Sequence, residues 1–332
     1  MLTKATVIGA GAMGTVMAQI LESNGMNVAL LARECELPEL LETRENRTYL
    51  PGVRLAAGVR PTDDPAAALA NAELIISAIP AQFLRGRWEE LAAHVPAGVP
   101  VCSVTKGIEL GTLLRPTQVI AQHAPNNPLA VLSGPSIAPE LARCLPATVV
   151  VASATPGLAE QLQSVMSTSW FRIYTSPDVL GVELAGALKN VIALAAGILD
   201  GLRAGDNAKS ALVTRGLVEI TRLGAALGAR AETFVGLAGV GDLITTCISP
   251  LGRNRSAGER IGRGHSVQQV IEQSPSVIEG IPTTRAVVEL ARRHRVEMPI
   301  TQAVYEVLFE DKSPLAAITE LMQRPPKAED RR

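Results

Sequence analysis

The chain of 332 residues contains few aromatic residues and almost no net charge. Aromatic residues make up 3% of it although 47% is hydrophobic, so its core must be built from aliphatic side chains. The 31 basic and 32 acidic residues nearly cancel, whereas binding of nucleic acid needs a clustered basic face. The composition therefore argues against a nucleic-acid partner and fits a globular protein long enough for two domains.

Cysteine is also scarce. The four cysteines lie far apart and form no Cys-x-x-Cys pair; they are Cys35, Cys102, Cys144 and Cys247. This spacing argues against a disulfide framework and against a zinc site. We expect reduced thiols in a cytoplasmic protein without a bound metal.

Long uncharged apolar runs are missing as well. The N-terminal residues Met1–Lys4 lead directly into a short apolar run, which predicts that there is no signal peptide. No uncharged apolar run reaches the ~18 residues of a membrane span, because the most apolar segment includes Glu183, Lys189 and Asp200. We therefore expect no membrane insertion.

The first half of the chain alternates short apolar runs with helical patterns. A helix is expected at residues 14–23, and strands are expected at residues 5–8, 27–32, 74–79, 99–104, 129–132, 148–151 and 171–174. Apolar runs without polar alternation are typical of strands buried on both faces. The pattern predicts a Rossmann-type, doubly wound parallel sheet.

The second half has only helical patterns. Asp178 is positioned to cap a helix over residues 179–202, and further helices are expected at residues 208–227, 266–273, 284–293 and 299–310. No strand is expected after Tyr174. The fold class is thus α/β, with a dinucleotide-binding domain over 1–180, an all-helical substrate domain over 181–325 and a frayed polar tail over 326–332.

A Gly-x-Gly-x-x-Gly motif joins the first strand to the first helix. Gly9 permits the tight turn, Gly11 lets the backbone approach a pyrophosphate, and Gly14 allows close packing of helix on strand. The start of the helix supplies free N–H groups for the phosphates. Strand, motif and helix in register predict a dinucleotide site, with a structural glycine turn as the less favoured interpretation.

The end of the second strand bears on the choice of cofactor. Arg33 follows it, and a guanidinium there can pair with the 2′-phosphate of NADP. Glu34 comes next and would instead suit the ribose hydroxyls of NAD. We favour NADP or use of both cofactors; a solvated Arg33 without a role is the alternative.

A lysine lies inside the most apolar helix, in the segment Gly186–Asn190. An ammonium at a ketone oxygen stabilises the alkoxide formed by hydride transfer and then protonates it. Burial would lower the pKa of Lys189, whereas Asp242, if adjacent, would raise it. The sequence leaves this balance open, as it does the possibility that the lysine merely extends its head group into water.

The chain resembles the bacterial-type NAD(P)-dependent glycerol-3-phosphate dehydrogenases from Gly9 to about Leu321. The segments that carry the resemblance, in order, are Asn46–Gly52, Thr105–Glu109, Ser133–Ser136, Ala187–Asn190, Leu212–Gly216, Gly239–Leu243, Arg253–Arg255, Val277–Gly280 and Glu297–Thr301. The resemblance implies reversible reduction of dihydroxyacetone phosphate to sn-glycerol 3-phosphate with NADPH or NADH, which feeds glycerophospholipid synthesis. It also implies a homodimer formed through the helical half.

The resemblance assigns roles to individual residues. The catalytic residues are Lys189, as proton donor or acceptor, Lys106 and Asp242. The substrate-binding residues are Lys106, Gly134, Ser136, Lys189, Asp242, Gly252, Arg253 and Asn254. Besides the motif glycines, the cofactor contacts are Ala12, Met13, Arg33, Lys106, Ala138, Arg253, Val277 and Glu279.

The loop Arg253–Arg255 suits a phosphate because it offers planar donors and backbone N–H groups together. Arg215 and Asn207 are further candidates; Arg215 lies in an apolar helical pattern where we expect an ion-pair partner. The chain departs from the usual family pattern at Ala12-Met13, Ile137, Pro139 and Gly252.

Two other functions fit the same features less well. A β-hydroxyacid or ketopantoate-type dehydrogenase has a similar plan and a catalytic lysine, but acts on a carboxylate. A nucleotide-sensing protein would bind NAD(P) without turnover, and retention of both lysines and Asp242 argues against it.

Overall fold

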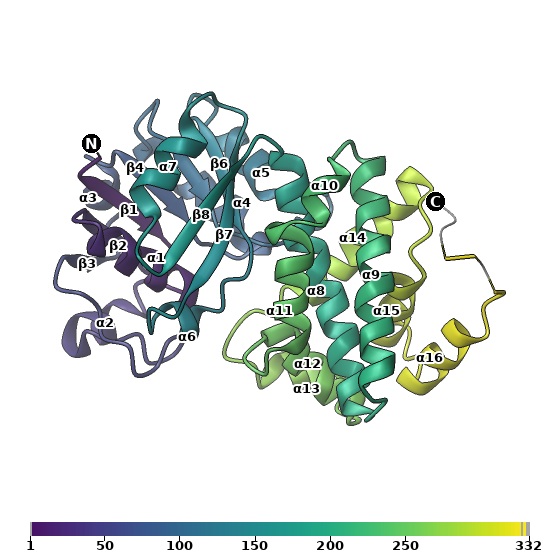
Figure 1. Cartoon of the computed structure of the whole chain (residues 1–332). Helices are drawn as coiled ribbons and strands as arrows, with labels where there is room; N and C mark the ends of the chain where they lie inside the picture. The colour runs from purple at the N-terminus through teal and green to yellow at the C-terminus, as the bar shows by residue number, and fades with distance from the viewer. Residues whose placement is uncertain (1, 327, 330–332) are drawn as a thin grey trace.

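The computed structural model describes residues 2–326 and 328–329. A sheet-containing half is followed along the chain by a helical half, and the two lie side by side (Figure 1). The strands of the sheet are β1 (Lys4–Ile8), β2 (Asn27–Leu31), β3 (Val59–Thr62), β4 (Leu74–Ser77), β5 (Val101–Ser103), β6 (Leu129–Ser133), β7 (Ala147–Ser153) and β8 (Phe171–Ser176). Their spatial order is β3-β2-β1-β4-β5-β6-β7-β8.

The expected Rossmann-type sheet is confirmed, but it is not parallel throughout. Strands β1 to β6 are parallel, whereas β7 pairs antiparallel to β6 and β8 pairs parallel to β7. Between β6 and β7 lies only the four-residue helix α6 (Ala138–Leu141), and a parallel connection needs a full crossover. An apolar run reads the same in either direction, so the sequence did not reveal this reversal.

One strand was not expected from the sequence. β3 has the sequence Val-Arg-Pro-Thr and forms the edge of the sheet next to β2. An edge strand has unpaired backbone N–H and C=O groups along one side, and it therefore tolerates proline and polar residues. Its short, polar sequence gives no strand signal.

Helices cover both faces of the sheet. Apolar side chains of α1 (Ala12–Ser23), α6 and α7 (Leu158–Met166) belong to the core on one face. Those of α3 (Pro65–Leu69), α4 (Ala81–Leu91) and α5 (Pro116–His123) belong to the core on the other. This two-sided cover explains why the strands are apolar on both faces and makes the sheet doubly wound.

The helical half is built around α8 (Val179–Gly201). Every residue from Gly181 to Leu199 is buried, and Asp178 caps the helix by accepting a 2.9 Å hydrogen bond from the Gly181 N–H, as expected. A helix that is apolar all round must be enclosed by others. Packed against it are α9 (Asp206–Ala226), α10 (Ala231–Phe234), α11 (Asp242–Ile248), α12 (Arg253–Gly262), α14 (Gly280–His294) and α15 (Pro299–Phe309). Farther out, α13 (Val267–Glu272) packs on α12, and α16 (Pro314–Met322) packs on α15. After β8, no strand occurs among the residues described.

Glycines let α8 and α12 touch backbone to backbone. A Cβ added at Gly197 would overlap the Arg255 carbonyl oxygen, and one at Gly258 would overlap the Leu194 carbonyl oxygen. Gly201 and Gly262 are equally crowded, so each helix presents glycines four residues apart. Because α12 begins at Arg253, this contact fixes the start of α12 relative to Lys189 on α8.

Two segments are long and apolar enough to cross a membrane by length and composition alone, Val179–Gly201 and Ala231–Ile248. The first is α8, which lies wholly inside the helical half. The second comprises α10, the π-helical turn Leu237–Gly241 and α11. Most of the tail expected to be frayed, 326–332, lies outside the described residues.

Candidate active site

The glycine-rich turn has the geometry of a dinucleotide site. Gly9 has φ +103°, and a Cβ there would stand 2.9 Å from the Ala78 carbonyl oxygen. At Gly14 a Cβ would overlap the Gly9 carbonyl oxygen, whereas the corresponding space at Gly11 is open. Gly11 thus leaves room for a ligand beside the first turn of α1, where backbone N–H groups lack helical partners.

Three charged side chains from distant parts of the chain meet at the carboxyl edge of the sheet. The two oxygens of Asp242 accept hydrogen bonds from different lysines: Oδ1 from Lys189 Nζ at 2.6 Å and Oδ2 from Lys106 Nζ at 2.7 Å. The Lys189 and Asp242 side chains are 6% and 3% exposed. These residues come from α8, the loop after β5 and the start of α11, so both halves contribute to the cluster.

Burial has the largest effect on the pKa of Lys189. Desolvation lowers its pKa to about 8; the Asp242 carboxylate opposes this, and the nearby Lys106 ammonium adds to it. The balance left open by the sequence is thus settled in favour of burial. Such an ammonium gives up its proton near neutral pH, as a general acid must.

Thr246 also holds the lysine. Its Oγ1 accepts a hydrogen bond from Lys189 Nζ at 2.9 Å. Thr246 lies four residues after Asp242 on α11 and therefore on the same helix face. Sequence reasoning missed this residue, although its spacing from Asp242 was a usable signal.

The loop after β6 completes the surroundings of Lys106. Its Nζ donates to the Gly134 carbonyl oxygen at 2.9 Å and to Ser136 Oγ at 3.0 Å. Gly134 has φ +134° and packs so closely on Val149 that a side chain would not fit. On α8, Gly186 leaves space for Ser133 Oγ, so the sheet edge can approach this helix closely.

A chain of amides connects this cluster to α12. Asn190 Nδ2 donates to the Lys106 carbonyl oxygen at 3.1 Å, and Asn190 Oδ1 accepts from Asn254 Nδ2 at 2.9 Å. Asn254 Oδ1 then accepts from the Gly280 N–H at 2.9 Å. The structure thus links Asn254 to the Lys106 backbone through Asn190, to which the sequence analysis gave no role.

The start of α12 presents the expected phosphate-binding residues. Gly252 precedes the helix, and a Cβ there would crowd the Thr246 and Ser249 carbonyl oxygens at 3.1 and 3.2 Å. Arg253 is exposed, and its Nη1 donates to the Val277 carbonyl oxygen at 3.3 Å. Glycine at position 252 departs from the usual family pattern, and the tight backbone there suits a residue without a side chain. The N–H groups in the first turn of α12 lack helical partners.

Glu279 joins the helical half to the sheet. Its Oε1 accepts a hydrogen bond from the Ala81 N–H at the start of α4, at 3.0 Å. Its Oε2 lies buried beside Gly107 and has no hydrogen-bond partner among the described residues. Burial raises the pKa of Glu279 to about 7, against the effects of the Ala81 N–H and Arg253. A buried acceptor without a donor at this edge suits a hydroxyl or amide of a bound nucleotide.

Arg33 lies apart from the lysine cluster, just beyond β2. Its Nε and Nη2 donate to Glu36 Oε1 at 2.9 and 2.6 Å, and Nη2 also donates to Tyr49 Oη at 2.8 Å. The side chain is 65% exposed, but it is not a solvated residue without contacts. Sequence reasoning considered Glu34 as its acidic neighbour and missed Glu36 and Tyr49.

The remaining candidate residues lie outside the lysine cluster. Arg215 is exposed on α9, so the ion-pair partner expected for a buried charge is not needed, and Asn207 is exposed in the first turn of α9. Ala138 begins α6, where Pro139 occupies the first turn and costs no helical hydrogen bond. Ala12 and Met13 form the first turn of α1 next to Gly11. The structure does not bring these residues into contact with the lysines.

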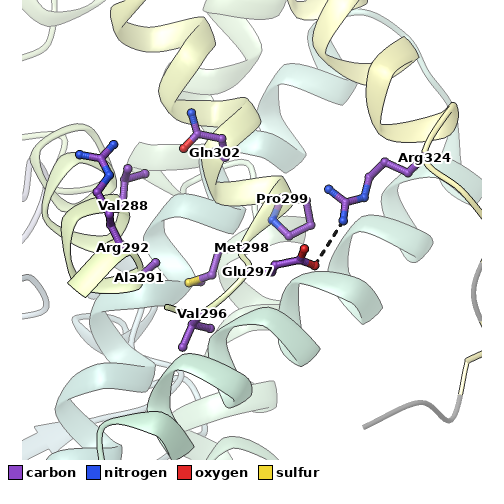
Figure 2. A pocket seen from close by; sticks show the side chains of 9 residues that line it. All are labelled: Val288, Ala291, Arg292, Val296, Glu297, Met298, Pro299, Gln302 and Arg324. Carbon is purple, nitrogen blue, oxygen red and sulfur yellow. Dashed lines mark hydrogen bonds and ion pairs between the residues drawn. The ribbon is translucent and has the colours of Figure 1, made fainter. Parts of the chain in front are cut away.

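A separate pocket of about 270 Å³ lies in the helical half (Figure 2). Val288, Val296 and Met298 contribute apolar side chains to it, and Arg324 pairs with Glu297 at 3.5 Å on its rim. The predicted site residues do not line it. We therefore distinguish this hollow from the candidate active site.

Models of one protein family match both halves of the chain. Residues 4–159 match the model of the N-terminal part of NAD-dependent glycerol-3-phosphate dehydrogenase, and residues 178–319 match that of its C-terminal part. The glycerol-3-phosphate dehydrogenase [NAD(P)+] of Desulfitobacterium hafniense is 47% identical over 99% of this chain and 93% of its own length. That of Streptomyces griseus is 46% identical over 99% and 98%.

Solved structures show the same relationship. The crystal structure of glycerol-3-phosphate dehydrogenase from Coxiella burnetii superposes with a TM-score of 0.94 at 35% identity, covering 97% of this chain and 99% of that one. A ketopantoate reductase from Ralstonia eutropha, at 15% identity and a TM-score of 0.59, shares the fold alone. The chain therefore belongs to the NAD-dependent glycerol-3-phosphate dehydrogenase family.

Proposed function

We propose that the cluster of Lys106, Lys189 and Asp242 is the catalytic centre of this chain. The chain is an NAD(P)-dependent glycerol-3-phosphate dehydrogenase, which interconverts dihydroxyacetone phosphate and sn-glycerol 3-phosphate for glycerophospholipid metabolism. The observation that carries the proposal is the single buried carboxylate shared by two lysines at the carboxyl edge of the sheet. Ligands of open α/β sheets bind at this edge.

The residues present fit a nicotinamide dinucleotide, which supplies the hydride when it is bound. The open space at Gly11 and the N-terminus of α1 would hold its pyrophosphate, and Arg33 would hold its adenosine end. The unpartnered Glu279 Oε2 supports a polar contact near the junction of the two halves. Ala12, Met13, Ala138, Arg253 and Val277 are proposed to complete this binding surface.

Lys189 would act on the carbonyl oxygen of the substrate. In the reductive direction that oxygen becomes an alkoxide, which the Lys189 ammonium stabilises and then protonates; in the oxidative direction the neutral amine accepts the hydroxyl proton. The lowered pKa, about 8, suits both roles. Asp242 and Thr246 orient the amine, and Lys106 adds positive charge beside it.

The phosphate of the substrate would lie at the start of α12. Arg253 offers a planar guanidinium, Asn254 an amide, and the first helical turn its free N–H groups. Gly134, Ser136 and Gly252 would line the rest of the substrate site. A carboxylate-specific dehydrogenase, the alternative considered from the sequence, is not favoured by the close relatives.

The decisive experiment follows NADPH and NADH oxidation by the absorbance of the reduced nicotinamide. We expect turnover with dihydroxyacetone phosphate and little with unphosphorylated dihydroxyacetone or with a panel of 2-keto acids. Arg253→Ala should raise the KM for dihydroxyacetone phosphate by more than about tenfold, because a charge-assisted pair to the phosphate is lost. Equal turnover of the unphosphorylated ketone by the wild type would contradict a phosphate site.

We also propose that the enzyme is a cytoplasmic homodimer. All four cysteines are free thiols, two buried and two exposed, which supports a reducing compartment. Exposed apolar side chains on the helical half, such as Val235 and Ile248, support an interface there. Sedimentation equilibrium gives the mass in solution; a monomer at micromolar concentration would contradict the dimer.

A further inference from the structure

Just after β2, the guanidinium of Arg33 is already paired with an acidic side chain. Glu36 Oε1 accepts from both Arg33 Nε and Nη2, and Glu36 Oε2 accepts from the Arg33 backbone N–H at 3.0 Å. The Glu36 side chain is only 17% exposed and lies beneath the more exposed arginine. The Glu36 carboxylate therefore accepts three hydrogen bonds from one residue and is fixed before any ligand arrives.

The pairing matters because of where Arg33 lies. In Rossmann folds the end of the second strand faces the adenosine ribose, where an acidic residue accepts from the 2′-hydroxyl of NAD and an arginine accommodates the 2′-phosphate of NADP. This chain has both residue types there, bonded to each other. The arginine fork is the group that would hold a 2′-phosphate bidentately, and Glu36 already occupies it.

We propose that Glu36 determines the cofactor preference by competing with the 2′-phosphate for Arg33, so that the enzyme uses NADH as well as NADPH. The proposal deepens the proposed function, on which it rests. A 2′-phosphate carries nearly two negative charges at neutral pH and is repelled by the Glu36 carboxylate. A ribose hydroxyl is neutral, and a carboxylate with three accepted bonds retains acceptor capacity for it.

The other acidic residues nearby do not share this position. The Glu34 side chain is exposed and forms no hydrogen bond or ion pair within the described part of the chain, and the same holds for the side chain of Glu42 on α2 (Leu37–Thr43). Tyr49 Oη also accepts from Arg33 Nη2, but it is a hydroxyl and not a carboxylate. Glu36 is thus the carboxylate whose removal frees the arginine fork.

The test is Glu36→Gln, with Glu42→Gln as the matched control because it removes the same charge from the neighbouring helix. Dissociation constants for NADPH and NADH are measured by calorimetry, alongside kcat/KM for each. We expect Glu36→Gln to tighten NADPH binding roughly five- to twentyfold, with NADH unchanged or weaker. The gain should shrink in about 0.5 M salt, because exposed charges are screened, whereas a purely structural effect would not.

Three results would overturn the proposal. One is an equal change for both cofactors in Glu36→Gln; another is the same NADPH gain in Glu42→Gln or Glu34→Gln; the third is a gain that salt does not reduce. If Glu36→Gln unfolds, Glu36→Asp retains the charge, and its ratio of NADPH to NADH affinity should stay within about threefold of wild type. A wild type that binds neither cofactor would refute the proposed function instead, so the two failures are distinguishable.

Discussion

At the scale of single residues, the proposed chemistry depends on a lysine that is buried but has a charged partner. Burial pushes the pKa of Lys189 down, the Asp242 carboxylate holds it up, and the result is about 8. A fully paired surface lysine would stay protonated far above the working pH. The enclosing α8 therefore makes Lys189 able both to give and to accept a proton.

This pKa predicts opposite pH dependences for the two directions. Reduction needs the ammonium, so its kcat/KM should fall as pH rises through about 8; oxidation needs the neutral amine, so its kcat/KM should rise over the same range. Steady-state profiles in both directions measure this. Lys189→Ala should lose most turnover, by at least about a hundredfold, while keeping nucleotide affinity.

Asp242→Asn tests whether Lys189 is the group that causes this pH dependence. Removing the carboxylate that raises the pKa of Lys189 should move the fall in reductive activity to lower pH. Thr246→Ser keeps its hydroxyl and serves as the control, with an unmoved profile. An Asp242→Asn profile identical to that of the wild type would show that another group titrates.

At the scale of elements, the contact of α8 with α12 positions the residues that we propose bind the substrate phosphate. Gly258→Ala would push its methyl group into the Leu194 carbonyl oxygen, and backbone atoms can yield only if the helices separate. We expect a loss of at least about 2 kcal/mol in unfolding free energy and a higher KM for dihydroxyacetone phosphate. Denaturant unfolding and steady-state kinetics measure the two effects.

Gly86→Ala is the matched control for this prediction. Gly86 lies in α4, is exposed, and has no atom within 4 Å of its added Cβ. Alanine there should stabilise the protein by up to about 1 kcal/mol, because glycine is a poor helix former. A similar loss in both variants would mean that the α8–α12 contact is not responsible.

A second element-scale feature is the carboxyl group that caps α15. Glu219 on α9 accepts hydrogen bonds from the Ile300 N–H at 2.6 Å and from the Thr301 N–H and Oγ1 at 3.2 Å. Burial nevertheless raises the pKa of Glu219 from 4.5 to about 7. The folded state thus holds this proton more tightly than the unfolded chain does.

Stability should therefore depend on pH through Glu219. Its contribution is fully present below about pH 4.5 and is lost as pH rises through about 7, a difference on the order of 3 kcal/mol. Glu219→Gln, which cannot ionise, should lose stability at low pH but flatten this slope. Urea unfolding at about pH 5 and pH 8 compares the slopes; an unchanged slope in the variant would contradict the prediction.

At the scale of the whole molecule, the site exists only where the two halves meet. Lys106 from the sheet half and Lys189 from the helical half share Asp242, and Glu279 reaches across to the Ala81 N–H. Glu183 on α8 also crosses the junction, accepting from the Thr117 N–H at 2.8 Å and from Arg115. We therefore expect ligand binding to be coupled to the docking of the two halves.

Glu279 makes this coupling measurable. If a bound nucleotide donates to Glu279 Oε2, it stabilises the ionised carboxylate, and binding releases a proton near the pKa of about 7. Affinity for NADH should then rise severalfold between about pH 6 and pH 8. Calorimetric titration of wild type and Glu279→Gln tests this; a wild-type affinity independent of pH would exclude a hydrogen bond at Oε2.

Much of this arrangement could be read from local sequence. The glycine spacing at Gly9, Gly11 and Gly14, the apolar strands and the Asp178 cap follow from short-range rules of backbone conformation and burial. The apolar surroundings of Lys189 indicated a buried amine because its neighbours on one helix are its neighbours in sequence. These features involve residues within a turn or two of one another.

The remaining features arose from contacts between distant segments, which no local pattern encodes. The direction of β7, the sharing of Asp242 by two lysines and the unpartnered oxygen of Glu279 all depend on how elements far apart in sequence pack. The sequence by itself determined the fold class and the glycine-rich turn, and it singled out Lys189 as the candidate reactive lysine. Only the tertiary structure decided the lysine's protonation, because desolvation and Coulomb interactions depend on distances in space.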